Sequence, residues 1–397
     1  MDVEKIREDF PVLQSKVTYF DSACMSLKPT QVVEAQNAYY EEYSGCAGRS
    51  LHKLGKKTEE KFEEARQKVA KFTGASANEV VWTRNTTEAI NLVARTLDFT
   101  KKNKVVTSNM EHHSALLPFM VPAKQGKLQM DYVKADAEGV THAEDWEEKI
   151  DEKTMLVVAH HTTNSVGTHA PLKEITKAAH DNGALVLVDA AQGVPHVETN
   201  FKKSEADFLA FSGHKMLGPT GMGCLLAKAK LLEELPPFMV GGETVEHVSL
   251  EAVTFLKPPQ KFEAGLQNYA GAIGLGAACD YLAKIGMRNV EEHEKKLAKK
   301  LFDALSGLGV KIYGPKDVKE RSALAAFNMG KARPHEVAMM LDKIANVAVR
   351  SGVFCAEPAM VHLGAPQGAV RASLYLYNTE AEVDYFRESL EKIAKLY

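Results

Sequence analysis

The chain has 397 residues, of which 45% are hydrophobic and 25% are charged. This length and composition are typical of a globular protein with a large core and two or three domains. The net charge of −3 gives no basic field to attract nucleic acid or an anionic membrane, so we expect neither as a partner.

The N-terminus and the cysteines indicate a cytoplasmic protein. The opening segment MDVEKIREDFPVL lacks the basic start and apolar stretch of a signal peptide. No apolar run in the chain approaches the ~18 residues of a membrane span. The cysteines are odd in number and scattered, without C-x-x-C spacing, so free thiols rather than a disulfide framework are expected. They are Cys24, Cys46, Cys224, Cys279 and Cys355.

Short apolar runs alternate with helical patterns through the first two-thirds of the chain. The runs are nearly continuous in apolar residues, as in strands that are covered on both faces of a parallel sheet. With helical segments at 87–97 and 172–182 between them, this order predicts an α/β sheet with helices on both sides. The predicted strands lie at 80–83, 104–109, 155–161, 184–190, 207–213 and 224–228.

One helix is predicted in more detail, over residues 57–73. Phe62, Ala65, Val69 and Phe72 recur at helical spacing on one face. Gly74 follows at the place where a C-terminal cap belongs.

The pattern changes after about residue 282. Long amphipathic helices there flank short strands, which predicts a smaller α+β domain. The helices are expected at 287–306, 335–345 and 379–395, and the strands in KIYG, LAAFNMG, VAVRSG and AVRASLYLY.

Polar residues follow the predicted strands at the ends where they would leave the sheet. Ligands of open α/β sheets bind beyond the carboxyl ends of the strands, so we expect these side chains to converge on one rim. They are Thr86, Thr87, His112, His113, His160, Asn164, Asp189, Gln192 and the segment Ser212 to Lys215.

Each of these residues also has an ordinary structural explanation. Asp189 could cap the following turn, and Lys215 could be a surface lysine whose stem packs on apolar neighbours. Thr86 and Thr87 could simply begin a helix, although such an N-terminus also binds phosphate. Together they suit a ligand with a phosphate, a basic ring nitrogen and a carbonyl that a lysine captures. Pyridoxal phosphate (PLP) has all three, and it is held by a lysine Schiff base with an aspartate at the ring nitrogen.

A metal site is the alternative that the histidine pairs suggest. His112–His113 and His160–His161 could supply ligands, because histidine is the commonest metal ligand. Neighbouring residues on a strand point to opposite faces, so each pair could contribute only one side chain. No H-E-x-x-H or comparable spacing occurs, so no metal is predicted.

The chain resembles the class V, fold-type I PLP enzymes, specifically the cysteine desulfurase and selenocysteine lyase group. The motifs follow the order of that family over nearly the whole chain, and SGHK with VDAAQ upstream is the most specific combination. The others are YFDSACMSLKP, TRNTTEAINLVA, MEHHSALLP, HTTNSVGT, FEAGLQN and RASLYLYNT.

The resemblance implies an α/β fold with two domains. Residues 12–282 would form a large PLP-binding domain with a mostly parallel seven-stranded sheet sandwiched by helices. Residues 283–397, with the N-terminal segment 1–11, would form a small α+β domain that carries the catalytic cysteine loop.

The resemblance also implies a role for each site residue. Lys215 would hold PLP covalently and move protons, Asp189 would contact the ring nitrogen, and Gln192 would contact the ring hydroxyl. His112 would stack on the ring and take part in catalysis. The phosphate would be held by Thr86, Thr87, Ser212 and His214, and the substrate's α-carboxylate by Asn164 and Arg371, whose planar fork suits a carboxylate.

Cys355 is the residue that the resemblance makes the sulfur acceptor. It lies in VRSGVFCAEPAM, and R-S-G-x-x-C-A-x-P resembles the branch of the family with the shorter catalytic loop. Outside that context a free cysteine is more often a small buried hydrophobe. As a thiolate, Cys355 would attack the sulfur of L-cysteine, leaving a persulfide on itself and releasing L-alanine.

Five residues, at four places in the chain, depart from the family pattern. Val353-Phe354 replaces a common His-His pair, Gly48 stands where a histidine often precedes Arg49, and Leu266 replaces a threonine that reaches the neighbouring subunit's phosphate. Cys24 replaces a usual alanine and is interpreted as a small packed residue.

The predicted function is that of a cysteine desulfurase serving iron–sulfur cluster assembly or other sulfur delivery. The expected partners are L-cysteine, a second copy of the chain in a homodimer, and a sulfur-acceptor or scaffold protein. The alternatives are selenocysteine lyase, cysteine sulfinate desulfinase or another class V reaction such as that of an aminotransferase or an epimerase. The aminotransferase and the epimerase do not need a mobile thiol, so Cys355 argues against them. A non-catalytic scaffold that keeps the fold is the alternative from a different class.

Overall fold

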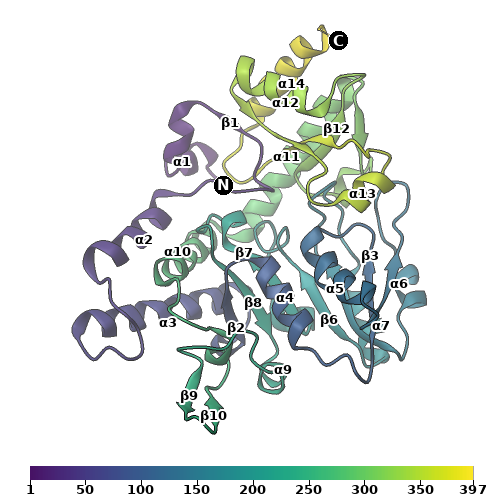
Figure 1. Ribbon diagram of the computed structural model, residues 1–397. Coiled ribbons are helices and arrows are strands. Elements are labelled where there is room, and N and C mark those ends of the chain that lie inside the picture. The colour runs from purple at the N-terminus through teal and green to yellow at the C-terminus, as the bar shows by residue number, and fades with distance from the viewer. Residues whose placement is uncertain (397) are drawn as a thin grey trace.

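A seven-stranded sheet and a four-stranded sheet organise the part of the chain that the computed structural model describes, residues 1–396 (Figure 1). The strands of the larger sheet come from residues 80–227, and those of the smaller sheet come from residues 311–373. The small sheet and its helices lie above the large sheet in the view of Figure 1, with the C-terminus at the top.

The larger sheet has the order β2-β8-β7-β6-β5-β3-β4. Its neighbouring strands pair in parallel from β7 to β4, while β8 runs antiparallel to β2 and β7. The prediction of a mostly parallel α/β sheet is therefore confirmed. The strands are β2 (Val80–Thr83), β3 (Lys104–Ser108), β4 (Gln129–Val133), β5 (Thr154–His160), β6 (Leu185–Asp189), β7 (Phe208–Ser212) and β8 (Gly223–Ala227).

Both faces of this sheet are buried, because successive residues of a strand point into different cores. In β5, Leu156 and Val158 pack in one hydrophobic cluster, and Val157 packs in the other. The first face is covered by α4 (Thr86–Thr96), α5 (His113–Lys124) and α9 (Ala229–Glu234). The second is covered by α3 (Lys53–Thr73), α6 (Ala143–Lys149), α7 (Leu172–Asp181), α8 (Phe201–Ser204) and α10 (Tyr269–Ile285).

Helix α3 confirms the predicted spacing and cap. Phe62, Ala65 and Val69 are buried against the second face, and Phe72 is half-buried beside them. Gly74 ends the helix with a φ of 68°, in the left-handed region that glycine adopts without the steric cost of a Cβ. The helix begins four residues earlier than predicted, at Lys53, because His52 accepts a hydrogen bond from the Gly55 amide (3.2 Å).

The smaller sheet is antiparallel in the order β11-β12-β15-β14. One face packs on α11 (Met287–Gly307), α12 (Pro334–Ala345) and α14 (Glu380–Ala394), which confirms the predicted long helices. The other face meets the large sheet's loops and α13 (Glu357–His362). Its strands are β11 (Lys311–Tyr313), β12 (Leu324–Asn328), β14 (Arg350–Gly352) and β15 (Ala369–Ser373).

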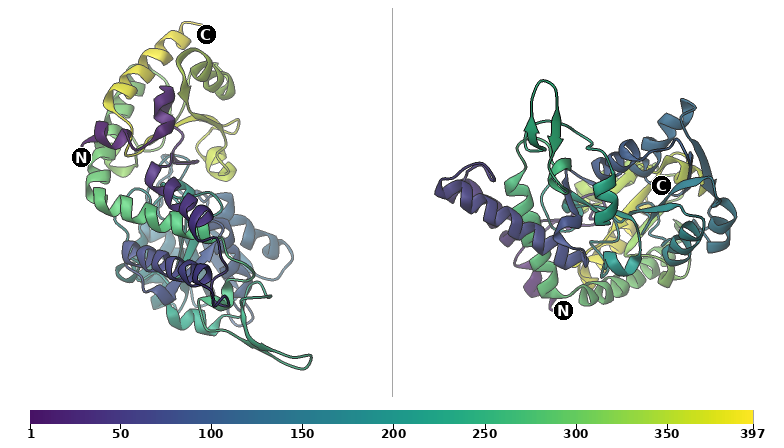
Figure 2. Two further views of the ribbon diagram at one scale, coloured as in Figure 1. Left: turned by 90° about the vertical axis from the view of Figure 1, so that its left-hand side faces the viewer. Right: turned by 90° about the horizontal axis from the view of Figure 1, so that it is seen from below.

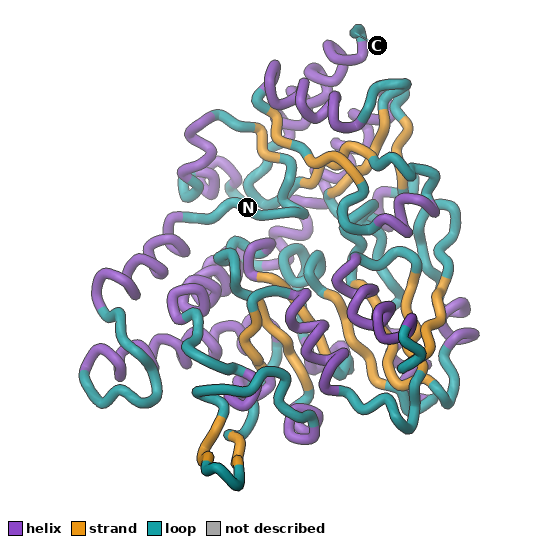
Figure 3. The backbone as a smooth tube through the Cα atoms, in the orientation of Figure 1, coloured by secondary structure: helices purple, strands orange, loops and turns teal. Residues whose placement is uncertain are grey.

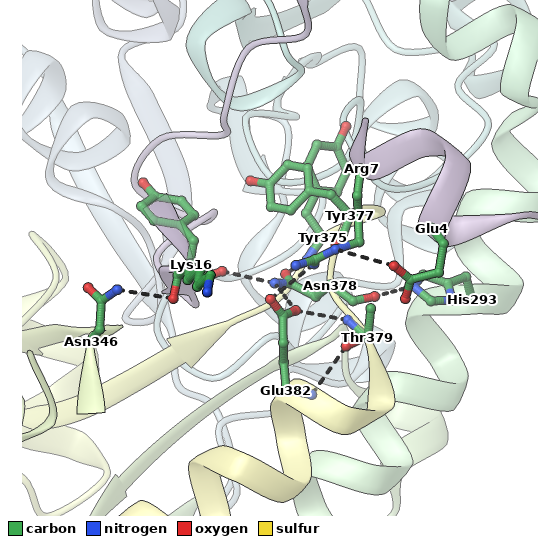
Figure 4. Close-up of polar contacts among 11 residues, drawn as sticks. Glu4, Arg7, Lys16, His293, Asn346, Tyr375, Tyr377, Asn378, Thr379 and Glu382 are labelled. Carbon is green, nitrogen blue, oxygen red and sulfur yellow. Dashed lines mark hydrogen bonds and ion pairs between the residues drawn. The ribbon is translucent and has the colours of Figure 1, made fainter. Parts of the chain in front are cut away.

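The N-terminal segment joins the two parts of the molecule. In β1 (Thr18–Tyr19), the backbone pairs with β13 (Val347–Ala348), so this segment lies with the small sheet although the predicted boundary assigns it to the large domain. Figure 4 shows the contacts of α1 (Val3–Arg7): Arg7 donates to the Tyr377 carbonyl (2.6 Å) and to Glu382 (3.0 Å). The exact domain boundaries stay a prediction.

Two further segments extend from the body of the large sheet. Helix α2 (Thr30–Glu42) packs on α10. The hairpin of β9 (Val245–Val248) and β10 (Val253–Phe255) projects away from the rest of the chain in both views of Figure 2. Within residues 1–396, no helix combines the length and the apolar character needed to cross a membrane.

Candidate active site

A cavity of about 230 Å³ lies at the carboxyl ends of the parallel strands, between the large sheet and the small domain. In Figure 3 these strand ends run into loops on the side that faces the small sheet. Every residue predicted for catalysis, cofactor or substrate lines this cavity, whereas His113 does not. They are Thr86, Thr87, His112, Asn164, Asp189, Gln192, Ser212, His214, Lys215, Cys355 and Arg371.

Asp189 and Lys215 form the acid–amine pair of the cavity. Asp189 is the last residue of β6, and its carboxylate accepts a hydrogen bond from the Ala191 amide (3.0 Å). Burial raises the pKa of Asp189, and the Ala191 amide and Lys215 partly oppose that effect. Burial also lowers the pKa of Lys215, against the attraction of Asp189. A desolvated amine beside a carboxyl group can become a neutral nucleophile and proton acceptor.

The turn that carries Lys215 depends on a glycine. Gly213 follows β7 directly, and a Cβ at that position would lie 2.9 Å from the Met222 carbonyl oxygen. The Gly213 amide instead donates to that carbonyl at 2.8 Å, which closes the turn Gly213–Lys215 against the start of β8. The lysine is therefore placed by backbone contacts of neighbouring strands.

The N-terminus of α4 forms the hydroxyl-rich end of the cavity. The Asn85 side chain caps the helix by accepting from the Glu88 amide (3.0 Å). Ser212 accepts from the Thr86 amide (2.9 Å), and its hydroxyl lies 2.7 Å from that of Thr86. A helix N-terminus lined by hydroxyls is suited to a phosphate.

His214 also lines the cavity, in the turn that follows β7. Burial, with a smaller contribution from the Lys215 charge, lowers the pKa of His214 to about 4. The imidazole is therefore neutral near pH 7 and acts as a hydrogen-bonding group rather than as a cation.

His112 and Gln192 line the cavity with orientations that hydrogen bonds fix. His112 Nδ1 accepts from the Ser114 amide (3.1 Å), which leaves the proton of the neutral ring on Nε2. Burial, and then the charge of Lys215, lowers the pKa of His112 to about 3. Gln192 donates its amide to the Ala23 carbonyl (2.7 Å). Both side chains are polar but uncharged around pH 7, which suits contacts to a heteroaromatic ring.

The pair His160–Glu111 was only partly found from the sequence. His160 Nδ1 lies 2.7 Å from Glu111 Oε1, and Ser108 donates to the same oxygen (2.7 Å). His160 stands opposite Asp189 in the register of β5 and β6, so both face the cavity. Glu111 is fully buried, and nothing in the sequence pattern marked it as the partner of a strand-end histidine.

His161 points to the other face of the sheet, as the alternation of a strand requires. It lies 2.9 Å from the Thr162 hydroxyl, and burial lowers its pKa to about 3. The histidine pair thus contributes one side chain to the cavity. Among residues 1–396, no group of three or more His, Cys, Asp or Glu side chains is arranged to hold a metal ion.

Arg371 and Asn164 form the end of the cavity next to the small sheet. Arg371 donates to the Asn164 carbonyl (2.9 Å) and to Asp21 (3.2 Å), an acidic partner that the sequence did not suggest. In the described residues, Arg371 Nε and Asn164 Oδ1 are buried without a hydrogen-bond partner. Buried polar atoms are normally paired, so these two indicate a polar ligand.

Cys355 lies in the loop between β14 and α13 and is exposed. Phe354 and Cys355 have φ angles of 56° and 54°, in the left-handed region that residues other than glycine rarely adopt. The Cys355 carbonyl accepts from the His113 amide (2.7 Å), and the Phe354 carbonyl accepts from the Asn164 side chain (2.7 Å). The thiol is therefore held at the mouth of the cavity.

The positions that depart from the family pattern fall in different places. Cys24 is half-buried and lines the cavity, as does Arg350, which the sequence analysis did not assign. Gly48 and Leu266 lie outside it, and Leu266 is 70% exposed.

Comparisons with known proteins agree with this geometry. A family model described as aminotransferase class-V matches residues 18–386. A probable cysteine desulfurase of Methanothermobacter thermautotrophicus is 43% identical over 99% of this chain and 98% of its own. A cysteine desulfurase of Escherichia coli is 38% identical over 99% of this chain and 98% of its own.

Solved structures give the same result. The apo structure of a cysteine desulfurase from Thermococcus onnurineus has a TM-score of 0.96 at 41% identity, over 99% of this chain and 98% of that one. The E. coli cysteine desulfurase CsdA has a TM-score of 0.93 at 33% identity, over 100% of this chain and 99% of its own. The fold is therefore that of fold-type I PLP enzymes, and the chain belongs to the class V aminotransferase family. Within that family it groups with the cysteine desulfurases.

The cavity fits the cofactor of this family. Asp189 has a pKa raised by burial, and a protonated ring nitrogen beside it would supply the positive charge that stabilises the carboxylate. Lys215 faces the same space with a pKa lowered by burial, and the capped N-terminus of α4 offers the phosphate site. An amine, an acid and an anion site thus surround one small cavity.

Proposed function

We propose that this PLP-dependent enzyme converts L-cysteine to L-alanine and carries the sulfur on Cys355 as a persulfide. One observation supports this most strongly. The exposed Cys355 thiol lines the same cavity as the desulfurase-type pair Asp189 and Lys215 and the anion-binding Arg371.

The substrate's carboxylate would bind at Arg371 and Asn164. The guanidinium of Arg371 is held by Asp21 and by the Asn164 carbonyl, and its Nε hydrogen remains available. A fixed fork of N–H donors binds a carboxylate with two parallel hydrogen bonds. In this orientation the substrate's amino group and side chain would lie between the sheet and the Cys355 loop.

Lys215 would take the α-proton of the bound amino acid and return a proton later. PLP, when bound, supplies the electron sink that makes this proton removable. Lys215 is suited to the task because burial lowers its pKa, so the neutral amine forms more readily than in an exposed lysine. Asp189 would keep the ring nitrogen of the bound cofactor protonated, His112 would pack on the ring, and Gln192 would contact the ring hydroxyl.

Cys355 would then accept the sulfur. Its thiolate attacks the substrate sulfur and forms an S–S bond, while the electron pair of the broken C–S bond stays on the β-carbon. That carbon takes up protons and leaves as the methyl group of alanine. The exposure of Cys355 would let a sulfur-acceptor protein collect the persulfide sulfur. Homodimerisation, a cytoplasmic location and delivery to iron–sulfur cluster assembly belong to the same proposal.

The test measures alanine and sulfide from L-cysteine with PLP-loaded protein, with and without a reductant. Cys355→Ala is compared with the wild type and with Cys46→Ala, which removes a thiol that does not line the cavity. Equal alanine and sulfide that depend on Cys355 alone support the proposal. Alanine formed from selenocysteine or cysteine sulfinate by Cys355→Ala, with no activity on cysteine in the wild type, would show a lyase instead.

A further inference from the structure

Phe354 lies between the sulfur-accepting thiol and the residues that face the substrate's carboxylate. Its side chain is 7% exposed and packs in an apolar cluster with Met110 and Met360. The Arg371 guanidinium carbon lies 4.9 Å from the centre of its ring. Its carbonyl oxygen accepts a hydrogen bond from Asn164 Nδ2 (2.7 Å). One residue therefore contacts both Arg371 and Asn164 and is bonded directly to Cys355.

Neighbouring contacts hold the backbone of Phe354 and Cys355 in an uncommon conformation. Phe354 and Cys355 are consecutive non-glycine residues with φ angles of 56° and 54°. Such conformations survive where neighbouring contacts fix them, and they concentrate at functional sites. The Asn164 side-chain amide donates to the Phe354 carbonyl, and the His113 backbone amide donates to the Cys355 carbonyl. The Ala356 amide closes the turn by donating to the Val353 carbonyl (2.9 Å). One of these three hydrogen bonds therefore comes from the carboxylate-binding pair.

The donors that remain on this pair suit a carboxylate. Arg371 Nε is buried without a partner, while its two other nitrogens already donate to Asn164 and Asp21. Asn164 Nδ2 has two hydrogens, of which the Phe354 carbonyl takes one. A carboxylate could accept hydrogen bonds from the Arg371 Nε–H and from the second hydrogen of Asn164 Nδ2. The hydrogen bond from Asn164 to the Phe354 carbonyl would then be kept.

Taking the function proposed above as its basis, we propose that Phe354 is a positioning residue that makes the placement of Cys355 depend on the substrate's carboxylate. Its flat ring holds the plane of the Arg371 guanidinium, which turns the Nε edge toward the substrate. Its carbonyl couples the loop to Asn164, so that a carboxylate that orders Asn164 also orders the loop. A bound amino acid with a carboxylate therefore fixes the position of the Cys355 thiol, whereas a bound amine without a carboxylate does not.

The experiment uses the PLP-loaded protein with Phe354→Leu, Phe354→Met and Phe354→Tyr. Val353→Ala is the matched control, because Val353 packs beside the same cluster but has no aromatic ring to stack on Arg371. L-Alanine and cysteamine, which lacks a carboxylate, are titrated by the absorbance of the bound cofactor. The rate of Cys355 alkylation by iodoacetamide is measured with and without L-alanine.

We expect the Leu and Met variants to bind L-alanine about 3- to 30-fold more weakly and to raise the KM for L-cysteine by a similar factor, the range of a partly buried cation–π contact. Cysteamine binding should stay within about twofold, because it lacks the group that Arg371 holds. L-Alanine should slow the alkylation of Cys355 in the wild type and in Phe354→Tyr, and should have no such effect in the Leu and Met variants.

Wild-type L-alanine affinity and alkylation response in both the Leu and Met variants would overturn the proposal. The same loss in Val353→Ala, or an equal loss of cysteamine binding, would also overturn it, because either would mean a general loosening of the loop. The desulfurase function fails separately, through absence of alanine from L-cysteine in the wild type. The response of alkylation to L-alanine needs no turnover and so tests Phe354 alone.

Discussion

The two walls of the cavity are built in different ways. On the sheet side, Asp189 and Ser212 are the last residues of neighbouring parallel strands, and Lys215 follows in a turn that is closed by backbone hydrogen bonds. On the loop side, Cys355 belongs to no strand or helix and sits in strained backbone that a few hydrogen bonds hold. The first wall is rigid because many strands fix it, and the second is held locally.

This difference matches the two tasks. A cofactor needs donors and acceptors at fixed positions, which the ends of parallel strands provide. A sulfur carrier must meet both a substrate inside the cavity and an acceptor outside it, which an exposed loop residue can do. We therefore expect changes on the sheet side to remove the cofactor chemistry, and changes on the loop side to affect substrate binding and sulfur transfer while the cofactor stays bound.

Lys215→Ala should have the largest effect, on the sheet side. Without the buried amine, alanine formation should fall by roughly 10³-fold or more, since a nucleophile and a proton carrier are lost together. Borohydride reduction followed by mass measurement of the protein should show covalent cofactor in the wild type and in Cys355→Ala, but not in Lys215→Ala. Covalent cofactor on Lys28, whose pKa burial lowers to about 8, would contradict the assignment of Lys215.

Asp189→Asn should lower activity by roughly 10²–10³-fold, the size typical of removing one electrostatic contact in an active site. The same variant should stabilise the cofactor-free protein at neutral pH. Burial raises the pKa of Asp189 in the folded state, so its ionisation costs stability as pH rises above the unfolded value of about 3.9. The difference in Tm between the variant and the wild type should therefore be positive at pH 7–8 and shrink toward pH 4.

The control for this prediction is Asp207→Asn. Asp207 is a second buried aspartate, but its carboxylate receives bonds from Lys228 (2.7 Å) and the Val186 amide (2.8 Å), away from the cavity. Its loss should lower Tm at pH 7 rather than raise it, because paired donors are left without an acceptor. An Asp189→Asn protein that is less stable than the wild type at pH 8 would mean that its pairing with Lys215 outweighs the cost of burial.

Gly368→Ala tests the loop side and should have an intermediate effect. A Cβ at Gly368 would lie 2.5 Å from the carbonyl carbon of Gly352, the residue that ends β14 just before the Cys355 loop. The backbone must shift, so formation of the Cys355 persulfide in a single turnover should slow about tenfold, or ~1.4 kcal/mol. Cofactor absorbance and affinity should stay the same.

Gly330→Ala is the matched control for this clash. Gly330 also has a positive φ, 52°, but a Cβ there meets nothing within 4 Å. It therefore carries the backbone strain of the substitution without the collision. A slow persulfide step in both variants, or weakened cofactor binding in Gly368→Ala, would show that the two walls are not independent.

The same contrast explains what the sequence could predict. Strands buried on both faces read as continuous apolar runs, and their ends bring Asp189 and Ser212 to one rim, so the sheet side was predictable. The edge strand β4 was missed because its sequence, QMDYV, mixes polar and apolar residues and is only partly buried. The strand predicted in AVRASLYLY was too long, since β15 ends at Ser373. Tyr375 lies beyond the strand, and its amide donates to the Asn378 side chain (2.8 Å).

Side-chain contacts between segments far apart in the chain could not be predicted, because they leave no local pattern in the sequence. Asp21 meets Arg371, and Glu111 meets His160, only because the chain folds each pair together. Phe354 on Arg371 is a contact of the same kind. Family resemblance could point to Cys355, but its left-handed backbone depends on the amides of His113 and Asn164 and could not be seen in the sequence.

Cys24→Ala should have the smallest effect, less than about twofold on alanine formation, as for a substitution that removes one small side chain and keeps the backbone. Cys24 lines the cavity with Cys355, and both thiols interact electrostatically with Lys215, so position alone does not separate them. Their surroundings do. Cys24 is half-buried in a turn whose amide donates to the Asp21 carbonyl (3.0 Å), whereas Cys355 is exposed.

A sulfur acceptor has to be reached from outside, and Cys24 is less exposed than Cys355. After one turnover with L-cysteine, alkylation and peptide mass measurement should therefore find the added sulfur on the Cys355 peptide and none on the Cys24 peptide. Sulfur on Cys24 in the wild type, lost in Cys355→Ala, would mean that a thiol outside the Cys355 loop also takes part in transfer. The division between a fixed cofactor wall and a sulfur-carrying loop would then have to be abandoned, because the second thiol would receive sulfur without any exposed loop of its own.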